Sequence, residues 1–143
     1  MVGPLGKGFV IDQAFEKIDL IAGGIGVAPL VFLADVLAAR GFSADRIRVF
    51  IGGAVADDVL CEREFTGMKV AVETATDDGS AGFHGFVTEP FEKGLKDRRP
   101  DMVFACGPPG MLRTVARIAD AGNIPCQVSV ESMMACGLGA CLG

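Results

Sequence analysis

The chain has 143 residues, of which 50% are hydrophobic and 22% are charged, so it fits one folded domain and is not a disordered protein. Its net charge of −5 and the lack of any run of Lys or Arg argue against binding to nucleic acid or to an anionic membrane surface. The longest apolar run, near residues 27–37, is interrupted and far shorter than a membrane span. No secretory signal opens the chain, so a cytoplasmic protein with reduced cysteines is expected.

Short apolar segments alternate with helix-like segments along the chain. Strands are expected at residues 18–22, 48–52, 69–74, 101–105 and 126–130, and helices at residues 27–40, 57–65, 86–95 and 111–121. A loop rich in Gly and Asp is expected at residues 76–85. Strands separated by helices of this length pair in parallel, and nearly continuous apolar strands are buried on both faces. The sequence therefore predicts an α/β fold, a three-layer α/β/α sandwich around a five-stranded parallel sheet.

A glycine-rich turn at residues 22–29 joins the first strand to the first helix. Gly23, Gly24 and Gly26 let the backbone turn tightly and approach a pyrophosphate, while the helix N-terminus offers free N–H groups. Pro29 is tolerated in the first helical turn, where its missing N–H has no partner. The turn departs from the G-x-G-x-x-G pattern of the commonest dehydrogenases. The alternative is a tight strand-to-helix crossover that binds nothing.

A second turn follows the fourth expected strand and reads CGPPGM at residues 106–111. Parallel strands end at the same edge of a sheet, and open α/β sheets bind ligands there. The two turns are therefore expected to converge on one cleft. For Cys106 alone, the alternative is a small buried thiol without a function.

Acidic residues follow the second and third expected strands. The sequence after Gly52 reads GAVADD at residues 53–58, and residues 76–80 read TDDGS. Neither segment has a cation to bind the 2′-phosphate of NADP, whereas carboxylates accept hydrogen bonds from ribose hydroxyls. These residues favour NAD, and the alternative is that they serve only turns and helix caps. His84, the single histidine, is interpreted as a solvated loop residue.

Cys136 and Cys141 are separated by four residues in a glycine-rich tail, MACGLGAC at residues 134–141. This spacing matches the start of the plant-type [2Fe–2S] pattern, C-x4-C-x2-C followed by a distant Cys. Such a cluster needs four thiolates, so these two residues are not expected to hold it alone. The alternative is a glycine-rich terminus with two incidental thiols.

The two glycine turns resemble the nucleotide-binding half of the ferredoxin–NADP reductase superfamily. With GPLG at residues 3–6, TDDGSAG at residues 76–82 and the cysteine tail, the chain resembles the electron-transfer subunit of dihydroorotate dehydrogenase. The resemblance implies pyrophosphate on the first turn and nicotinamide beside Cys106. The cofactor-binding residues it implies are Gly23, Gly24, Gly26, Ala28, Pro29, Gly52, Thr76, Asp77, Cys106, Gly107, Pro108 and Met111, with Cys136 and Cys141 as metal ligands.

In that family a complete subunit carries FAD on an N-terminal barrel and one [2Fe–2S] cluster, and it passes electrons between NAD and the FMN of a catalytic partner subunit. The resemblance implies three parts: residues 1–16 as a linker from a missing barrel, residues 17–131 as the NAD-binding domain, and residues 132–143 as a truncated cluster-binding segment. FAD and the cluster are expected only in a longer protein, and this fragment alone is expected to be inactive. No catalytic acid or base is expected, because the cofactors carry the chemistry.

Two other functions stay open. The flavin subunit of an NAD(P)H–ferredoxin oxidoreductase or of a sulfide dehydrogenase is built from the same parts. A nucleotide-sensing module would keep the cleft without the chemistry.

Overall fold

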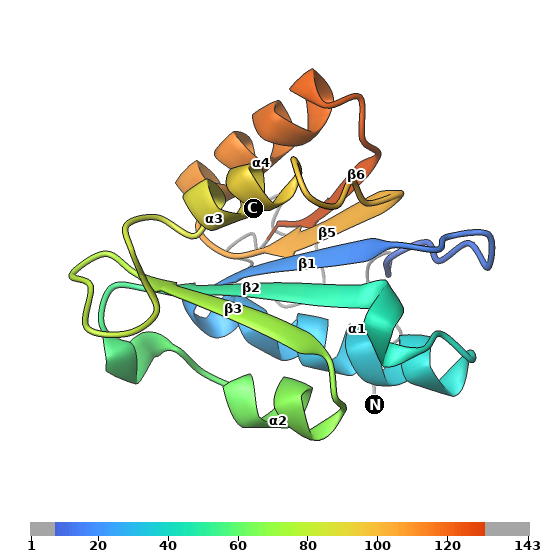
Figure 1. Cartoon of the computed structure of the whole chain (residues 1–143), viewed down its shortest axis with the longest axis horizontal. Helices are drawn as coiled ribbons and strands as arrows, with labels where there is room; N and C mark the ends of the chain where they lie inside the picture. The colour runs from blue at the N-terminus through green and yellow to red at the C-terminus, as the bar shows by residue number, and fades with distance from the viewer. Residues whose placement is uncertain (1–7, 131–143) are drawn as a thin grey trace, which may run out of the picture.

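A six-stranded sheet in the order β4-β3-β2-β1-β5-β6 forms the centre of the molecule (Figure 1). The computed structural model describes residues 8–130. The strands are β1 (Ile18–Gly23), β2 (Ile47–Gly53), β3 (Ala71–Thr76), β4 (Phe83–His84), β5 (Met102–Cys106) and β6 (Cys126–Ser129). The helices are α1 (Val27–Ala39), α2 (Glu62–Gly67), α3 (Thr88–Gly94) and α4 (Pro109–Ala121), with short 3-10 turns η1 (Gly24–Gly26), η2 (Ala44–Arg46) and η3 (Ala56–Asp58). All five strand pairs are parallel.

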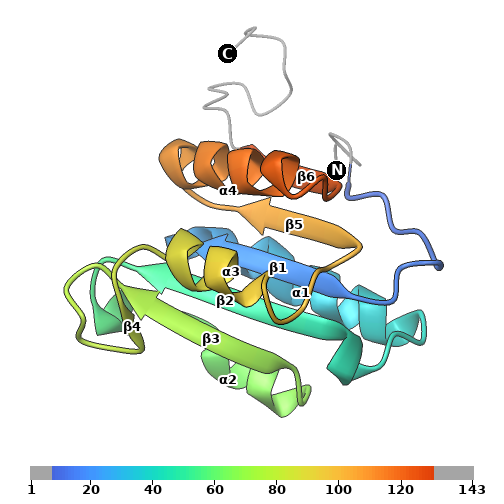
Figure 2. The same cartoon turned by 45° about the horizontal axis from the view of Figure 1, so that its top comes forward.

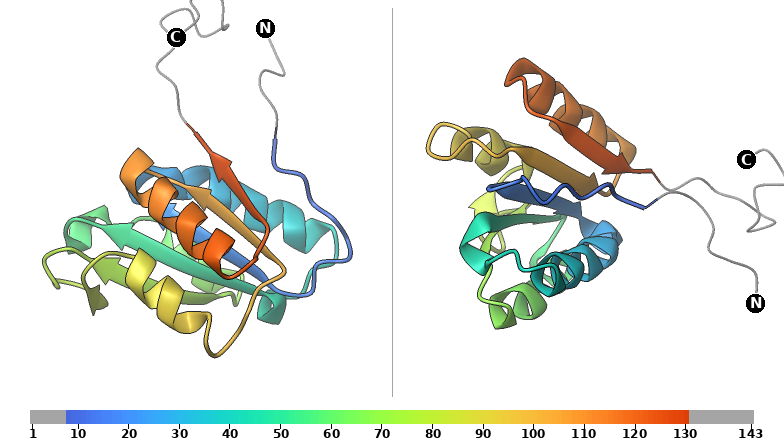
Figure 3. Two further views of the ribbon diagram at one scale, coloured as in Figure 1. Left: turned by 90° about the horizontal axis from the view of Figure 1, so that it is seen from above. Right: turned by 90° about the vertical axis from the view of Figure 1, so that its right-hand side faces the viewer.

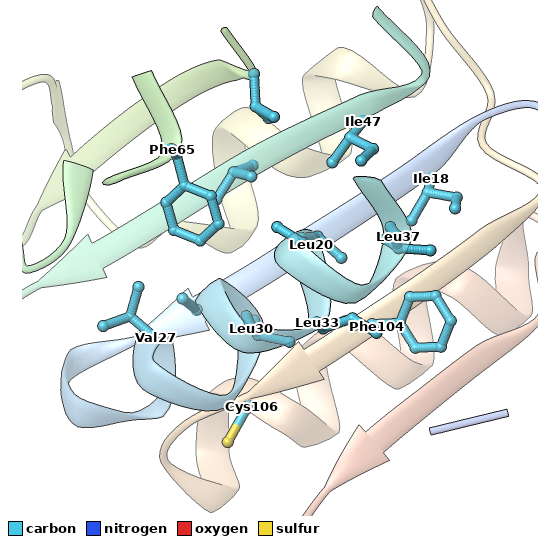
Figure 4. Packing of buried hydrophobic residues seen from close by; sticks show 14 of the residues in the cluster. Ile18, Leu20, Val27, Leu30, Leu33, Leu37, Ile47, Phe65, Phe104 and Cys106 are labelled. Atoms are coloured by element: carbon cyan, nitrogen blue, oxygen red, sulfur yellow. The ribbon is translucent and has the colours of Figure 1, made fainter. Parts of the chain in front are cut away.

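Helices cover both faces of the sheet, α1 and α2 on one side and α3 and α4 on the other (Figure 2). Successive residues of a strand point to opposite faces, so Leu20 packs in the cluster under α1 while Ile21 packs in the cluster under α3 and α4. Figure 4 shows the first of these clusters, with Phe65 of α2 and Leu30 of α1 packed over β1 and β2. The predicted three-layer α/β/α class is confirmed.

The prediction of five strands is wrong by one. Strand β4 has two residues and lies inside the segment expected to be a loop, where Phe83 and His84 pair with Ala75 and Thr76. Gly82 and Gly85 flank it with φ angles of +65° and +135°. Two residues between glycines leave no alternating pattern to recognise in the sequence.

The single helix expected at residues 57–65 is also wrong. The structure has the 3-10 turn η3 and the separate helix α2, and Cys61 between them adopts a left-handed conformation with φ of +59°. A non-glycine residue in that region interrupts helical geometry. The acidic residues that suggested the first turn of a longer helix belong to η3 instead.

The amino ends of β1 and β2 are joined by a buried ion pair. Asp19 is fully buried and Arg48 is 8% exposed, and the two residues are opposite one another in the β1–β2 register. Arg48 donates from Nη2 to Oδ2 of Asp19 at 2.7 Å and from Nε to Oδ1 at 3.2 Å. It also donates to the carbonyl oxygen of Gly94 at the end of α3. This pair fastens α3 to the sheet at the end opposite the glycine turns.

Residues 8–16, the described part of the linker expected at residues 1–16, pass β6 near Val10 and then turn back to the start of β1 (Figure 3). Val10 donates from its backbone N–H to Oε1 of Gln127 at 2.8 Å, and the Gln127 amide donates back to the Val10 carbonyl at 2.9 Å. The ring of Phe9 packs edge-on against Phe104, with ring centres 5.0 Å apart. This segment therefore covers part of the sheet on the α1 side, over β5 and β6.

Candidate functional site

The two glycine turns meet in a cleft of about 320 Å³ at the carboxyl edge of β1 and β5. The register explains the meeting, because Ala22 and Cys106 are paired residues and each turn starts directly after them. The cleft is lined by Gly23, Gly24, Ile25, Gly26, Gly107, Pro108, Pro109, Leu112 and Val130. The structure thus brings together the two motifs that lie more than eighty residues apart in the chain.

Three glycines allow one turn to pack against the other. A Cβ at Gly23 would lie 2.7 Å from Sδ of Met111 and 2.8 Å from Cδ of Pro108. A Cβ at Gly26 would overlap the carbonyl group of Cys106, and one at Gly107 would lie 2.9 Å from the backbone nitrogen of Gly23. These contacts are closer than real Cβ atoms make, so the glycines are needed for the fold of the cleft walls whatever binds between them.

Gly24 differs from its neighbours. Its φ is +52°, in the left-handed region, and no heavy atom lies within 4 Å of the position a Cβ would take. The missing side chain therefore leaves open space in the cleft wall. The helix α1 starts three residues later, at Val27. The N–H of Val27 donates to the carbonyls of Gly24 and Ile25 and Pro29 has no N–H, so Ala28 supplies the first N–H of the helix that needs an outside partner.

The other residues expected near the pyrophosphate lie around the start of α1. Ala28 is exposed in the first helical turn. Pro29 is the third residue of α1 and lines a different hollow, of about 670 Å³, which lies between α1, β6 and residues 8–11. The structure therefore does not bring Pro29 into the cleft.

Cys106 closes β5 beneath the second turn. Its residue surface is 1% exposed, and Figure 4 shows it at the carboxyl end of β5, at the margin of the cluster under α1. The cleft surface is formed instead by Gly107 and Pro108. Met111 lies behind them, with its thioether against Gly23 and Gly107.

The residues expected near the adenosine ribose lie at the ends of β2 and β3. Gly52 of β2 pairs with Gly23 of β1 on one side and with Ala75 of β3 on the other. Val87 packs directly over Gly52. Thr76 is fully buried, and its hydroxyl donates to the Ala81 carbonyl at 2.8 Å and accepts from the Ala81 N–H at 3.0 Å. The Thr76 side chain thus stabilises the loop between β3 and β4.

The two aspartates of this loop have different surroundings. Asp78 accepts hydrogen bonds from the N–H and the hydroxyl of Ser80, at 2.9 and 2.6 Å, and the hydroxyl bond lowers the pKa of its carboxyl. Asp78 therefore serves the turn. Asp77 is exposed directly after β3, and its backbone N–H donates to the Gly53 carbonyl at 3.1 Å, so the backbone fixes its position beside the end of β2.

Sequence reasoning missed four residues that line the cleft, namely Ile25, Pro109, Leu112 and Val130. Ile25 is 75% exposed between two glycines, and Leu112 and Val130 contribute apolar side chains to the lining of the cleft. No sequence signal distinguished Ile25 or Val130 from ordinary core residues.

The metal ligands expected at Cys136 and Cys141 lie outside the described residues. Within residues 8–130, no three His, Cys, Asp or Glu side chains gather in a way that could hold a metal ion. In the same part of the chain, no helix is long and apolar enough to cross a membrane.

Comparison with known families adds to this geometry. The family model described as "Oxidoreductase NAD-binding domain" matches residues 20–117. The electron transfer subunit of dihydroorotate dehydrogenase B (NAD(+)) from Desulforamulus reducens is 39% identical over 99% of this chain and 53% of its own length. The probable subunit of the same name from Methanocaldococcus jannaschii is 37% identical over 97% of this chain and 52% of its own length. The chain spans about half the length of these curated relatives.

Solved structures share the fold. An NADH-dependent reduced ferredoxin–NADP oxidoreductase, described in connection with flavin-based electron bifurcation, superposes with a TM-score of 0.76 and 29% identity over 98% of this chain and 49% of its own. The C-terminal domain of a hydrogenase from Pyrococcus furiosus superposes with a TM-score of 0.69 and 20% identity over 90% of this chain and all of its own. The second likeness concerns the fold alone.

Proposed function

The chain belongs to the family of oxidoreductase NAD-binding domains, and on that premise we propose that it is the NAD-binding part of an electron-transfer subunit serving a dihydroorotate dehydrogenase. The names and the identities of the relatives support this assignment. Residues 1–16 would then lead from a flavin-binding barrel, residues 17–131 would bind NAD, and residues 132–143 would begin a cluster-binding segment. FAD, a [2Fe–2S] cluster held in part by Cys136 and Cys141, and a catalytic partner subunit containing FMN belong to this proposal.

The observation that carries the NAD site is the open left-handed Gly24 at the mouth of a cleft built from two interlocked turns. A phosphate can approach the backbone there because no Cβ obstructs it, and the start of α1 adds N–H groups and a positive dipole end. Dinucleotides bind across the carboxyl edge of open α/β sheets, where all these residues lie. The residues that line this edge therefore fit a bound dinucleotide.

The remaining candidates follow the edge in order. The pyrophosphate would lie on Gly23, Gly24, Gly26 and Ala28, and Pro29 would shape the start of the helix. The adenosine ribose would lie on Gly52, Thr76 and Asp77. The nicotinamide would lie beside Cys106, Gly107, Pro108 and Met111. When bound, NAD supplies hydride transfer. The chain's own residues orient the dinucleotide and keep water from its nicotinamide end. The apolar side chains of Ile25, Leu112 and Val130 suit that second task.

Titration calorimetry on the 143-residue chain with NADH, NADPH and ADP-ribose tests the proposal. ADP-ribose carries the pyrophosphate and adenosine without nicotinamide, so its affinity does not depend on a flavin wall. We expect ADP-ribose and NADH to bind and NADPH to bind more weakly. Absence of both ADP-ribose and NADH binding would contradict the proposal.

Gly24→Ala is the variant that probes the cleft itself. The added Cβ projects into the open space that a phosphate would enter, so ADP-ribose affinity should fall by about tenfold or more. The left-handed backbone also costs about 1–2 kcal/mol of stability with alanine, in the free and the bound protein alike. Gly41→Ala is the matched control, because Gly41 also has a left-handed backbone (φ of +88°) with open space around it but does not line the cleft. Equal affinities in the two variants would speak against phosphate binding at Gly24.

A second candidate is the flavin subunit of a ferredoxin-linked oxidoreductase, favoured by the structural likeness at 29% identity over 98% of the chain. The two candidates share the NAD site and differ in the partner. Activity measurements on the complete protein in its native complex distinguish the two candidates. Reduction of NAD by dihydroorotate would support the first, and reduction of NAD or NADP by reduced ferredoxin would support the second.

A further inference from the structure

A hollow of about 670 Å³ lies between α1, β6 and the first described residues of the chain. Among the described residues, none lines both this hollow and the cleft between the glycine turns. Its lining is mostly apolar and includes Phe9, Ile11, Phe32, Val36 and Val128. Phe32 is 71% exposed. Contiguous apolar surface of this kind marks a site of contact with another segment or another protein.

Helix α1 is apolar on its outward side as well as on the side that faces the sheet. Leu30 and Leu37 are buried against the strands, yet the exposed positions of α1 hold Phe32 and three alanines, and Asp35 is the only charged residue of the helix. Helix α4 has the same length and an ordinary polar outer face, with exposed Arg113, Arg117 and Asp120. A helix that is apolar all round is normally covered on all sides. The outer face of α1 is therefore expected to have a cover.

The chain leaves β6 at this hollow. Ser129, the last residue of β6, lines it, and the two ends of the described chain lie side by side at the carboxyl end of β6 (Figure 3). Thirteen residues follow, the tail 131–143, in which Glu131 has the only charged side chain. Eight residues of the tail are apolar, namely Met133, Met134, Ala135, Cys136, Leu138, Ala140, Cys141 and Leu142. A segment this apolar that starts beside an apolar hollow is stabilised by covering it.

The length of the tail also suits the hollow. Helix α1 has 13 residues and, at about 1.5 Å per residue, is about 20 Å long. An extended chain spans about 3.3 Å per residue, so roughly six or seven residues of the tail reach along the whole helix. Methionine side chains, which the tail has at positions 133 and 134, fill irregular apolar gaps well. Residues 1–7 enter at the same place, but they are fewer and include Pro4 and Lys7, so the tail is the better match.

We propose that the tail 131–143 docks in this hollow, with Met133 and Met134 packed against Phe32 and Val36 on the outer face of α1. The docking needs neither NAD nor a metal cluster, so it goes beyond the proposed function and does not rest on it.

The docking has a consequence for the nucleotide cleft. Pro29 lines the hollow and Gly26 lines the cleft, so the two sites meet at the start of α1. A docked tail keeps Cys136 and Cys141 close to this meeting point. Where the proposed function also holds, the helix that begins the NAD site therefore also positions the first residues of the cluster-binding segment.

The composition of the chain allows a fluorescence test on the full 143 residues. The sequence contains no Trp and no Tyr, so Phe32→Trp introduces a single indole into the hollow. Phe86→Trp is the matched control, because Phe86 is 65% exposed in the connection between β4 and α3, and β4 and β6 are the two opposite edges of the sheet. We expect Phe32→Trp to emit at a shorter wavelength than Phe86→Trp and to be quenched less by iodide.

Substitutions in the tail identify what shields the indole. Met133→Asp combined with Met134→Asp places carboxylates where the proposal requires apolar contact, and a carboxylate is not buried in an apolar hollow without a partner. The pair should shift the emission of Phe32→Trp to longer wavelength and increase its quenching by iodide. The same pair should leave the emission of Phe86→Trp unchanged.

Disulfide trapping locates the tail independently. Phe32→Cys is oxidised with diamide in dilute solution, and peptide mapping identifies the cysteine that the introduced thiol has joined. A disulfide requires Cα atoms about 4.4–6.8 Å apart, so a link within one chain to Cys136 or Cys141 reports a docked tail. Phe86→Cys is the control and should form no such link.

Three results would overturn the proposal. Equal emission and equal quenching of Phe32→Trp and Phe86→Trp, with no link to the tail, would mean that the tail does not cover the hollow. A shielded indole that does not respond to the tail substitutions would assign the hollow to residues 1–7. An indole that becomes exposed on dilution would assign it to a second copy of the chain. Nucleotide binding enters none of these measurements, so the proposed function is judged separately by the ADP-ribose titration, and either can fail without the other.

Discussion

Gly26 lies directly against the backbone carbonyl of Cys106, which places the start of α1 in contact with the end of β5. The backbone nitrogen of Gly107 is also only 2.7 Å from the position of a Cβ at Gly26. The obstructing atoms are backbone atoms of a buried strand end, which cannot rotate away as a flexible side chain could. Gly26 is therefore required by the packing of the cleft walls, independently of any ligand.

Gly26→Ala should destabilise the domain. Overpacking of a tight contact costs about 1–3 kcal/mol, so the midpoint of urea unfolding should fall. Gly67→Ala is the control, because Gly67 lies in α2 with open space around it, and alanine there should stabilise by roughly 0.5–1 kcal/mol. Equal stability of Gly26→Ala and wild type would show that the two turns can separate without cost.

The fold was largely predictable because its signals are local. Apolar strands such as the one at Leu20 and Ile21 are buried on both faces, and the helices between them have ordinary lengths. What the sequence could not predict depends on contacts with distant residues. Strand β4 exists because Phe83 and His84 lie beside the end of β3, and no property of those two residues alone requires a strand.

The site was predictable in its motifs but not in the roles of individual residues. The parallel order of strands is enough to bring the two glycine turns together. It does not reveal that Gly23 and Gly26 serve packing while Gly24 opens the cleft, because that distinction depends on which atoms each Cβ would meet. Similarly, residues 77 and 78 are both aspartates, and the sequence alone does not distinguish them. Only the hydrogen bonds from Ser80 identify Asp78 as the turn residue and Asp77 as the exposed carboxylate.

Asp77→Arg should shift the cofactor preference towards NADP. Asp77 is exposed at the end of β3, and a carboxylate there repels a 2′-phosphate, whereas a guanidinium donates charged hydrogen bonds to it. One such interaction is worth about 1.5–3 kcal/mol, so the ratio of NADPH to NADH affinity should rise by roughly tenfold or more.

Asp120→Arg is the control for net charge, since Asp120 is exposed in the last turn of α4. It changes the total charge equally and should leave the affinity ratio near that of wild type. Calorimetric titration of both nucleotides at one fixed salt concentration gives the comparison. A ratio that changes equally in both variants would assign the effect to overall charge and remove Asp77 from the ribose site.

Arg48→Ala should be among the most destabilising substitutions in the domain. It leaves the fully buried carboxylate of Asp19 without its main partner, and breaking a buried ion pair in this way typically costs about 3–5 kcal/mol. The double variant Asp19→Leu with Arg48→Leu removes both charges, so it should be more stable than Arg48→Ala. Urea unfolding of these variants, with the exposed Arg113→Ala as control, measures the difference. A loss no larger than that of Arg113→Ala would mean that Asp19 is not held by Arg48.

Asp101 should determine part of the loss of stability in acid. Its carboxylate accepts hydrogen bonds from the N–H groups of Glu16 and Lys17, both at 2.9 Å, and these bonds lower the pKa of the carboxyl from its ordinary value of 3.8. A carboxyl whose pKa is lower in the folded state stabilises the protein above the unfolded-state pKa. That stabilisation is lost as the pH falls through 3.8 towards the folded-state pKa.

Asp101→Asn keeps the shape without the charge, so its free energy of unfolding should fall less steeply between pH 5 and pH 3 than that of wild type. Asp120→Asn should follow wild type. Parallel curves for wild type and Asp101→Asn would show that these two bonds do not favour the ionised form of Asp101.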